Sequence, residues 1–311
     1  MQRTSKTEHD ESQPIAVTGG TGFIGQHLLQ HLDEMGCSTR ALSRSKPTHA
    51  VTFPKSTQSV QGDLSSSSAL DRLLRGTKTC IHLAGATKSV NSAGFHETNV
   101  IGTFNLAARA ARAGVEHFVY LSSQAAQAPN VSSYAASKAT SEQSLAPFAS
   151  KMAITIVRPP AVIGPGDPML KPVFSLIKNG WLAAPSEPRG RDRQFAIISV
   201  RDLVSEIGRI VQQPQNRSAL LKPSSLGSTN WSEIGKAISE TQDKRVREIR
   251  ISPLIMRAAG RIADGVTTLT RQTMPISYGK VCELLAAEWT YDSEVQDAMS
   301  LEEILDVSLK S

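Results

Sequence analysis

The sequence predicts a doubly wound α/β fold, a parallel sheet covered by helices on both faces, with a smaller mixed lobe after it. Through the first half of the 311-residue chain, short apolar runs alternate with longer segments whose apolar residues recur at helical spacing. Strands that alternate with helices in this way form right-handed βαβ units and a parallel sheet. The pattern changes after Pro159, where Pro and Gly become frequent and helical segments then dominate.

Six apolar runs are the predicted strands, and six are enough for a doubly wound sheet. They cover residues 15–17, 40–42, 59–61, 80–83, 118–121 and 154–157. Two of the segments between these strands, residues 23–35 and 99–113, have apolar residues at helical spacing. The polar segment 1–13 precedes the first strand and lacks the apolar core of a signal peptide, so we expect a disordered tail there.

Gly19, Gly22 and Gly25 form a glycine-rich turn between the first strand and the first helix. At this spacing the first glycine permits a tight turn, the second lets the backbone approach a pyrophosphate, and the third allows close helix–strand packing. The start of the helix, with Phe23 and Ile24, presents unpaired N–H groups to the phosphates. The turn therefore predicts a dinucleotide site, and a glycine turn without a ligand is the alternative.

The end of the second strand distinguishes the two nicotinamide dinucleotides. A carboxylate there hydrogen-bonds the ribose 2′-OH of NAD, whereas an arginine accommodates the 2′-phosphate of NADP. The segment contains Ser43 and Arg44, and it has no carboxylate between Arg40 and Lys46. We therefore predict NADP, with NAD as the alternative. The competing interpretation is that these cations are solvated surface residues.

Tyr134 and Lys138 are a predicted acid–base pair. Positions four apart share one face of a helix, so the phenol and the ammonium address the same site. The cation stabilises a phenolate, which makes the tyrosine usable as an acid or base near neutrality. Ser122 and Ser123 end the preceding strand, where a hydroxyl can hydrogen-bond a substrate carbonyl oxygen. An exposed helical pair is the alternative, which the context of a dinucleotide-binding sheet disfavours.

Composition excludes several classes of protein. No apolar run is long enough to span a membrane, so we expect no membrane span. The net charge of +6 is spread along the chain and aromatic residues make up only 5%, so we expect no nucleic-acid partner. The three cysteines are widely separated, which disfavours disulfides and favours a reducing cytoplasm. The seven histidines form no cluster of three or four ligands, so we predict no metal site.

Residues 253–270 have apolar side chains at helical spacing, with Arg257 and Arg261 between them. A helix of this kind can lie on a membrane surface. We expect instead that it packs its apolar stripe on its own lobe, because most amphipathic helices bury the stripe in their own protein.

Seven motifs make the chain resemble the short-chain dehydrogenase/reductase superfamily, and in particular its extended branch, the NAD-dependent epimerase/dehydratase family. They are TGGTGFIG at 18–25, GDL at 62–64, HLAG at 82–85, NVIGT at 99–103, YLSS at 120–123, YAASK at 134–138 and RPPAVIGPGD at 158–167. The likeness is strong over residues 14–167 and patchy beyond them. It implies a Rossmann fold for the first lobe.

The resemblance implies roles for the matching residues. Tyr134 is the proton donor or acceptor, and Lys138 supports it and holds the nicotinamide ribose. Ser123, rather than Ser122, polarises the reacting oxygen, and Asn99 is a structural and proton-relay support. The implied cofactor contacts beyond the glycine turn are Asp63 and Leu64 at the adenine, Ala84 and Gly85 along the central portion, and Pro159 and Val162 at the nicotinamide amide.

The resemblance also implies a division of the chain. Residues 14–165 form the dinucleotide-binding domain, and residues 195–213 supply a strand and a helix that return to it. Residues 166–194 and 214–311 form the substrate-binding lobe. Outside the segment 253–270, the helices that periodicity predicts after Pro159 cover residues 172–179, 202–212, 231–241 and 278–287. A homodimer through a four-helix contact is a further expectation.

The chain departs from the family pattern in ways that narrow its activity. The uncharged residues 124–126 follow Ser123 where dehydratases carry acidic residues, so elimination of water is disfavoured. Only ten residues separate Ser123 from Tyr134, which predicts a more open or differently shaped pocket. Arg193 is a candidate for binding the phosphates of a nucleotide sugar through its planar guanidinium, and an exposed basic loop is the alternative.

The sequence therefore predicts a cytoplasmic NADP(H)-dependent oxidoreductase. It transfers hydride between nicotinamide and a carbonyl or secondary alcohol of a small-molecule substrate, with Tyr134 as the acid or base. The first alternative is a nucleotide-sugar 4-epimerase that keeps NAD bound through its cycle. The second is a non-catalytic dinucleotide-binding module. No motif in the C-terminal half identifies the substrate.

Overall fold

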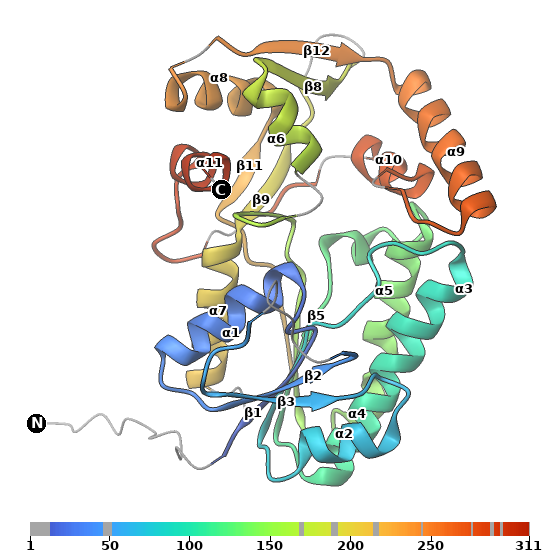
Figure 1. The fold of residues 1–311 in the computed structure, drawn as a ribbon, viewed down its shortest axis with the longest axis vertical. Coiled ribbons are helices and arrows are strands. Elements are labelled where there is room, and N and C mark those ends of the chain that lie inside the picture. The colour runs from blue at the N-terminus through green and yellow to red at the C-terminus, as the bar shows by residue number, and fades with distance from the viewer. Residues whose placement is uncertain are drawn as a thin grey trace, which may run out of the picture.

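A computed structural model gives the fold of the chain. It describes residues 13–45, 52–167, 171–187, 192–213, 218–243, 245–274, 276–286, 289–292 and 295–310. The predicted tail, apart from Gln13, lies outside the described residues, as does Lys46. The chain forms a larger lobe around a central sheet and a smaller lobe above it in the view of Figure 1.

The central sheet has seven parallel strands in the order β3-β2-β1-β4-β5-β6-β10. They are β1 (Ile15–Thr18), β2 (Thr39–Ser43), β3 (Thr57–Gln61), β4 (Thr79–His82), β5 (His117–Leu121), β6 (Ala153–Val157) and β10 (Ala219–Leu221). The strand order reverses between β1 and β4, which confirms the predicted doubly wound, Rossmann-type sheet. Beyond the six predicted strands, the structure adds the short edge strand β10.

Both faces of the sheet are covered by helices. On one face, α1 (Phe23–Glu34) and α7 (Val200–Gln212) pack side by side. On the other, α2 (Ser67–Leu74) and α4 (Gly102–Ala113) pack on the sheet, and α5 (Ser133–Ser144) contacts α4. Strands covered on both faces need apolar residues at nearly every position, which is why the central strands form continuous apolar runs in the sequence.

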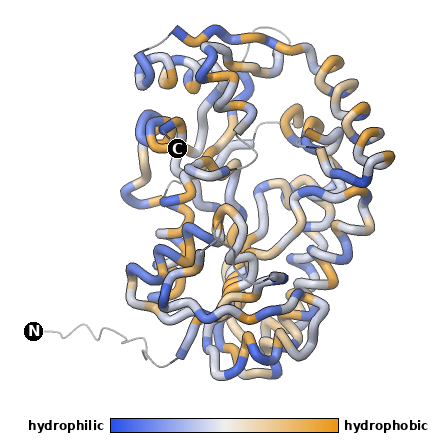
Figure 2. The backbone as a smooth tube through the Cα atoms, in the orientation of Figure 1, coloured by the Kyte–Doolittle hydropathy of each residue, from blue (hydrophilic) through white to orange (hydrophobic). Residues whose placement is uncertain are grey.

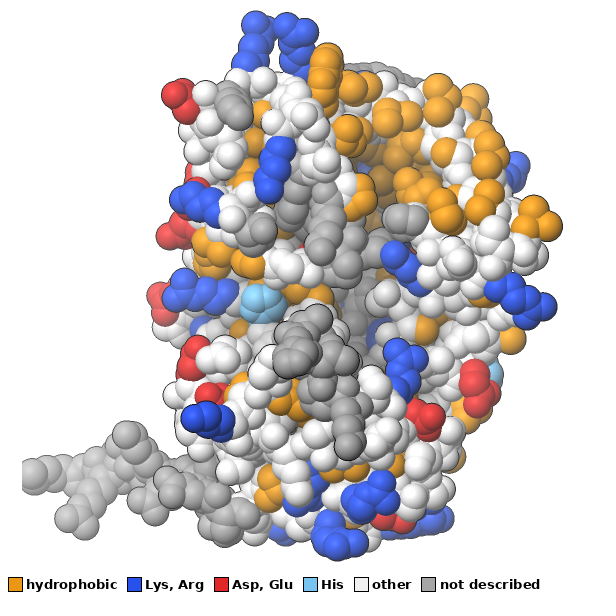
Figure 3. Space-filling model, in the orientation of Figure 1, with side chains coloured by type: hydrophobic (Ala, Val, Ile, Leu, Met, Phe, Trp, Pro, Cys, Tyr) orange, Lys and Arg blue, Asp and Glu red, His pale blue; other side chains and the backbone are white. Residues whose placement is uncertain are grey.

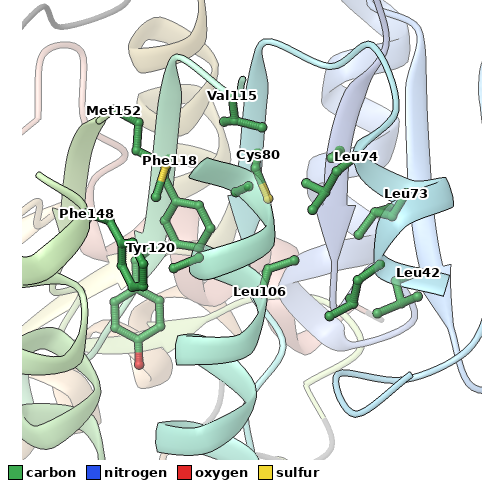
Figure 4. Packing of buried hydrophobic residues seen from close by; sticks show 14 of the residues in the cluster. Leu42, Leu73, Leu74, Cys80, Leu106, Val115, Phe118, Tyr120, Phe148 and Met152 are labelled. Atoms are coloured by element: carbon green, nitrogen blue, oxygen red, sulfur yellow. The ribbon is translucent and has the colours of Figure 1, made fainter. Parts of the chain in front are cut away.

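Strand β5 contributes side chains to the hydrophobic cores on both sides of the sheet, one of which is drawn in Figure 4. Phe118 and Tyr120 of β5 point to the side of the sheet where Leu106 of α4 and Leu73 of α2 are buried. Val119, between them, is buried on the opposite side, with α1 and α7. This alternation fixes the register of β5, because a slip of one residue would exchange the two sets of side chains.

The smaller lobe contains two short sheets and several helices. One sheet has the order β11-β9-β7, and in the other β8 pairs with β12 in parallel. These strands are β7 (Ala161–Ile163), β8 (Trp181–Pro185), β9 (Phe195–Ser199), β11 (Leu226–Thr229) and β12 (Arg247–Ile251). The helices are α6 (Lys171–Lys178), α8 (Trp231–Thr241), α9 (Pro253–Thr270), α10 (Tyr278–Leu285) and α11 (Leu301–Leu309). The predicted mixed lobe is therefore present, whereas the exact assignment of residues to two domains stays a prediction.

The hydropathy of the chain, drawn in Figure 2, is not distributed evenly between the lobes. Apolar residues concentrate inside the larger lobe, and α9 carries them along its length at the edge of the smaller one. No helix among the described residues is long and apolar enough to cross a membrane. The same residues contain no group of three or more His, Cys, Asp and Glu side chains that could hold a metal ion.

Candidate active site

Two glycines of the glycine-rich turn are required by packing, and a side chain at the third would be crowded far less. Gly19 has a φ of +76°, and a Cβ there would lie 2.6 Å from the Ala84 nitrogen. A Cβ on Gly25 would lie 2.1 Å from the Gly19 carbonyl oxygen. A Cβ on Gly22 would meet only that oxygen, at 3.3 Å. Packing alone therefore requires glycine at positions 19 and 25, whereas the predicted reason for glycine at position 22 is the close approach of a ligand.

Helix α1 begins at this turn with unpaired N–H groups. Gly22 is its N-cap residue and provides no side chain to cap the helix. The N–H of Gln26 donates to the Gly22 carbonyl at 3.0 Å, at the start of the helix. The N–H groups of Phe23, Ile24 and Gly25 consequently have no acceptor within the helix, and their partial positive charge suits phosphate oxygens. The turn thus fits the pyrophosphate of a dinucleotide.

Ser43 and Arg44 lie at the end of β2, where they differ in exposure. Ser43 is buried, and its hydroxyl donates to the Ser45 carbonyl at 2.5 Å. Arg44 is exposed and makes no hydrogen bond or ion pair with another described residue. Hydrogen bonds from Ser65 hold the pKa of the Asp63 carboxyl below its usual range, and the nearby charge of Arg44 adds to the effect. Arg44 is therefore a cation available to a ligand beside Asp63.

Arg40, four residues earlier, has a structural role instead. Its guanidinium donates to the carbonyls of Arg72, Leu73 and Arg75 at 2.8–3.0 Å. These carbonyls end α2, where a cation satisfies unpaired acceptors and interacts favourably with the helix dipole. Arg40 thus anchors α2 to β2, which makes Arg44 the better candidate for a cofactor phosphate.

A cavity of about 510 Å³ is lined by residues from both lobes. Apolar atoms form most of its wall. The predicted site residues that line it are Ile24, Gly85, Ser123, Tyr134, Lys138, Pro159 and Val162. The predicted residues outside this lining are Gly19, Gly22, Phe23, Gly25, Ser43, Arg44, Asp63, Leu64, Ala84, Asn99 and Arg193. The predicted acid–base residues and the nicotinamide contacts are thus brought together, whereas the predicted adenosine contacts lie elsewhere.

Tyr134 and Lys138 border the cavity from the same face of α5. Lys138 is buried, its Nζ donates to the Leu121 carbonyl at 2.7 Å, and it lies 4.4 Å from the centre of the Tyr120 ring. Burial lowers the pKa of Lys138, and interactions with Tyr134 and Glu142 oppose this. The ammonium is therefore held in place by a carbonyl and an aromatic ring next to the cavity.

The two adjacent serines have different surroundings. Ser122 is buried, and its hydroxyl donates to Glu142, which also forms an ion pair with Arg158 at 2.5 Å. Ser123 accepts a hydrogen bond from the Ala125 N–H at 3.2 Å, and its own O–H donates to no other described residue. Ser122 thus braces α5 through Glu142, whereas Ser123 keeps a hydroxyl hydrogen available to the cavity.

Asn99 lies behind the cavity wall, on a π-helical turn at His96–Ile101 that continues into α4. Its side-chain amide accepts from the Ala86 N–H at 2.7 Å and donates to the Ala86 carbonyl at 3.1 Å and to Ser137 Oγ at 2.8 Å. Turns of this type are frequent at functional sites. Asn99 therefore ties the loop after β4 to α5, and its role as a proton relay stays a prediction.

Two charged residues of α10 also line the cavity, and no sequence motif marks them. Lys280 Nζ lies 5.8 Å from the centre of the Tyr134 ring and 3.0 Å from the Glu283 carboxylate. The Ser132 hydroxyl donates to the other oxygen of Glu283 at 2.5 Å. Burial lowers the pKa of Lys280, but Glu283 and Tyr134 more than offset this, so the pKa lies above its usual value. These residues reach the site only through the packing of α10.

Arg193 is engaged by residues outside the cavity lining. Its guanidinium donates to the Ala286 carbonyl and forms an ion pair with Glu187 at 3.1 Å. A substrate phosphate would have to compete with Glu187 for this arginine. Binding of substrate by Arg193 therefore stays a prediction.

Comparisons with known proteins bear on this site. A sequence model of the NAD dependent epimerase/dehydratase family matches residues 15–219. A ceramide reductase from Caulobacter vibrioides is 34% identical over 279 residues, which cover 90% of this chain and 86% of the relative. A UDP-glucose 4-epimerase from Vibrio cholerae is 24% identical over 284 residues, which cover 82% of this chain and 85% of the relative. Both reductases and epimerases are thus among the similar proteins.

A solved structure supports the fold. MoeE5 in complex with UDP-glucose and NAD matches with a TM-score of 0.72 and 20% identity. The match covers 96% of this chain and 97% of that one. At this identity the likeness concerns the fold alone, so the ligands of MoeE5 do not define those of this chain.

Proposed function

The chain belongs to the NAD-dependent epimerase/dehydratase family, and from that premise we propose that it is an NADPH-dependent reductase of a ketone on a long apolar molecule. The family and its relatives make it an NAD(P)-dependent enzyme, which removes the alternative of a non-catalytic binding module. The cavity carries the proposal, because Ser123, Tyr134 and Lys138 lie in a wall formed mostly by apolar atoms. Such a wall suits a ketone on an apolar chain better than a sugar diphosphate.

The chain's own residues supply the proton and the positioning. Ser123 donates a hydrogen bond to the ketone oxygen, and Tyr134 transfers its phenolic proton to that oxygen as the carbon is reduced. When bound, the nicotinamide supplies the hydride that the carbon receives. The charge of Lys138 stabilises the phenolate until it recovers a proton from solvent. The product is a secondary alcohol.

The preference for NADPH over NADH rests on Arg44. This exposed cation lies at the end of β2, where enzymes of this fold accommodate the 2′-phosphate of NADP. Other members of the fold carry NAD, as in the MoeE5 complex, so the preference is a property of this chain's own residues.

The relative named ceramide reductase indicates which ketone to test first. We expect purified protein to oxidise NADPH when it is given a ceramide that carries a ketone in place of a hydroxyl, dispersed in detergent micelles. One alcohol should form for each NADPH consumed. Tyr134→Phe should lower kcat by roughly 10²–10⁴-fold, the usual contribution of a positioned general acid.

Tyr291→Phe is the matched control for this experiment. The Tyr291 hydroxyl donates only to the Arg158 carbonyl among the described residues, at 2.8 Å, so its loss should leave kcat unchanged. Failure to oxidise NADPH with ketone lipids of any chain length would contradict the reductase proposal. Equal loss of activity in the two variants would contradict the role of Tyr134.

A sugar-nucleotide 4-epimerase is the second candidate, favoured by the UDP-glucose 4-epimerase relative. In that case Arg193 would bind a phosphate of the substrate, after exchanging its ion pair with Glu187. Incubation with UDP-glucose and no added cofactor distinguishes the two. Formation of the C4 epimer without net change in NADPH would favour the epimerase.

Two further expectations stay part of this proposal, a homodimer and a cytoplasmic location. Light scattering on the purified protein measures its mass in solution and tests the first. Fractionation of cells that produce the protein tests the second.

A further inference from the structure

Most amphipathic helices bury their large apolar side chains in their own protein, but helix α9 exposes them. The residues that it buries are small, Gly260, Ala263 and Thr267. A Cβ added to Gly260 would lie 2.8 Å from the Tyr278 Cα, so α9 and α10 approach each other closely at this point. The close packing leaves no room for large side chains between the two helices. The sequence-based expectation that the apolar stripe packs on its own lobe is therefore wrong.

The large apolar residues of α9 are on the outside. We call them the α9 face: Leu254, Ile255, Ile262, Val266 and Leu269. Leu254 is 74% exposed, Ile262 69% and Leu269 85%, values that a residue of a closed core does not have. At 3.6 residues per turn the five lie within an arc of about 120° along a helix of about 27 Å. Figure 3 shows apolar side chains gathered on this part of the surface.

The exposed charges beside the α9 face are positive. Arg257 and Arg261 lie on the same helix, and Arg271 follows its end. The acidic residue of the helix, Asp264, is half-buried and accepts a hydrogen bond from the Tyr278 N–H at 3.2 Å. An apolar stripe with arginines along its edge is the pattern of a helix that lies in the interface of an anionic membrane.

The α9 face adjoins the candidate active site. Asp264 and Thr267 of α9 line the cavity, as do Thr273 and Met274 just after the helix. Met274 is itself 39% exposed, so this apolar side chain belongs both to the outer surface and to the cavity wall. A molecule that lies in a bilayer beneath α9 would therefore be next to the entrance of the site.

We propose that the α9 face docks on an anionic lipid surface and admits an apolar substrate from it into the cavity. The docking rests on the exposure and charge of α9 alone, and only the delivery of substrate rests on the proposed reductase function. Each exposed leucine contributes by transferring its side chain from water into the acyl boundary. Each arginine adds attraction to anionic headgroups, a contribution that salt screens.

A second copy of the chain is a poorer occupant of this face. A two-fold contact places a surface patch against itself. It would bring Arg257 and Arg261 of one copy close to those of the other with no exposed carboxylate of α9 between them. An anionic lipid surface instead supplies the opposite charge.

Flotation with vesicles tests the docking without any substrate. We expect the protein to float with phosphatidylcholine vesicles that contain phosphatidylglycerol, and to float at least tenfold less with phosphatidylcholine alone or at high salt. Leu254→Ser with Leu269→Ser should weaken the partitioning at least tenfold. The matched control is Leu176→Ser with Val307→Ser, on the exposed sides of α6 and α11, which should float like the wild type.

The arginines are tested by comparing two variants that have the same net charge as each other. Arg257→Gln with Arg261→Gln should weaken binding to anionic vesicles by roughly tenfold or more. Arg75→Gln with Arg112→Gln removes the same charge from exposed positions on the larger lobe and should leave binding unchanged. Equal effects of the two pairs, or no flotation of the wild type, would overturn the docking proposal. So would conversion of a dimer to a monomer by the leucine variant, because the α9 face would then be a subunit contact.

A comparison of two ketones separates docking from function. The leucine variant should reduce a short water-soluble ketone at the wild-type rate, and a long-chain ketone embedded in anionic vesicles at least tenfold more slowly. If the wild type binds vesicles but reduces neither ketone, the reductase proposal fails and the docking stands. If the leucine variant reduces the vesicle-embedded long-chain ketone as fast as the wild type does, delivery through the α9 face is excluded.

Discussion

We expect single residues to determine which cofactor and which proton donor this chain uses. Arg40 lies in β2 and Arg44 directly follows this strand. Of the two, Arg40 donates hydrogen bonds to carbonyls at the end of α2, whereas Arg44 makes no hydrogen bond or ion pair with a described residue. In the same way Ser122 and Ser123 both line the cavity, but the Ser122 hydroxyl donates to Glu142, whereas the Ser123 hydroxyl donates to no other described residue. In each pair, local hydrogen bonds engage one side chain, so the other is the better candidate for contact with a ligand.

Arg44 should therefore determine the preference for NADPH. Arg44→Ala removes a charge-assisted bond to the 2′-phosphate, so kcat/KM with NADPH should fall roughly 10- to 100-fold, a loss of about 1.5–3 kcal/mol. NADH, which lacks this phosphate, should be used almost as before. The measurement is kcat/KM for each cofactor, with Arg112→Ala as the control of equal charge. An equal loss with NADH would show that Arg44 supports the fold rather than the phosphate.

The predictability of the site varies from residue to residue for a physical reason. Tyr134, Lys138 and the glycines lie in local patterns whose spacing reflects one helix or one turn. Lys280 and Glu283 lie in the same cavity, but nothing near them in the sequence points to Tyr134. They arrive through the contact between α10 and α5, which the sequence of α10 does not encode by itself.

At the scale of elements, we expect different glycines of the glycine-rich turn to serve stability and cofactor binding. Gly25→Ala would place a methyl 2.1 Å from the Gly19 carbonyl oxygen, and we expect it to lower the free energy of unfolding by more than about 2 kcal/mol. Gly22→Ala meets only that oxygen, at 3.3 Å, and should change stability by less than about 1 kcal/mol. Its methyl would instead stand where we expect the backbone to approach the pyrophosphate, so the KM for NADPH should rise at least tenfold.

Urea unfolding without cofactor and cofactor titration measure the two effects separately. Gly36→Ala is a control for the mutation itself, since a Cβ there meets nothing within 4 Å, although its φ of +76° adds some backbone strain. If Gly22→Ala were as unstable as Gly25→Ala, position 22 would be a packing position and not the approach to the phosphates.

Helix α9 shows a limit of sequence patterns at the same scale. Its periodicity predicts the helix with the right ends, Pro253–Thr270. The periodicity also predicts an apolar face on this helix, but it is the same whether that face packs on a protein core or on a bilayer. The sequence feature that distinguishes the two cases is the set of small residues on the buried side, Gly260, Ala263 and Thr267, because a Cβ at Gly260 would already lie 2.8 Å from the Tyr278 Cα of α10.

Across the whole molecule, the larger lobe follows from the sequence and the smaller one only in part. The buried central strands β1, β4 and β5 stand out as apolar runs because both faces of their sheet are covered. The strands β7, β8, β11 and β12 have three to five residues with mixed burial or mostly exposed side chains. Strands of this length form through pairing with distant partners, so their local sequence is not distinctive.

Two buried histidines should control the acid stability of the whole larger lobe. His82 lies in β4 between Thr18 and Thr103, and burial, with a smaller effect of the Lys138 charge, lowers its pKa to about 3. Burial lowers the pKa of His117, in β5, to about 4. An unfolded histidine titrates near its usual pKa of about 6.5. Between that pH and the folded pKa values, the unfolded chain therefore binds more protons than the folded one.

The free energy of unfolding should consequently decrease as the pH falls from about 6.5 toward 4, by up to about 1.4 kcal/mol per pH unit for each histidine. Urea unfolding across this range measures the slope. His117→Gln should keep a hydrogen bond to Thr155 and make the slope shallower, whereas the exposed His96→Gln should leave it unchanged. A free energy of unfolding that stays constant or increases as the pH falls from about 6.5 to about 4 would contradict this prediction. The two imidazoles would then take up protons in the folded protein despite their burial.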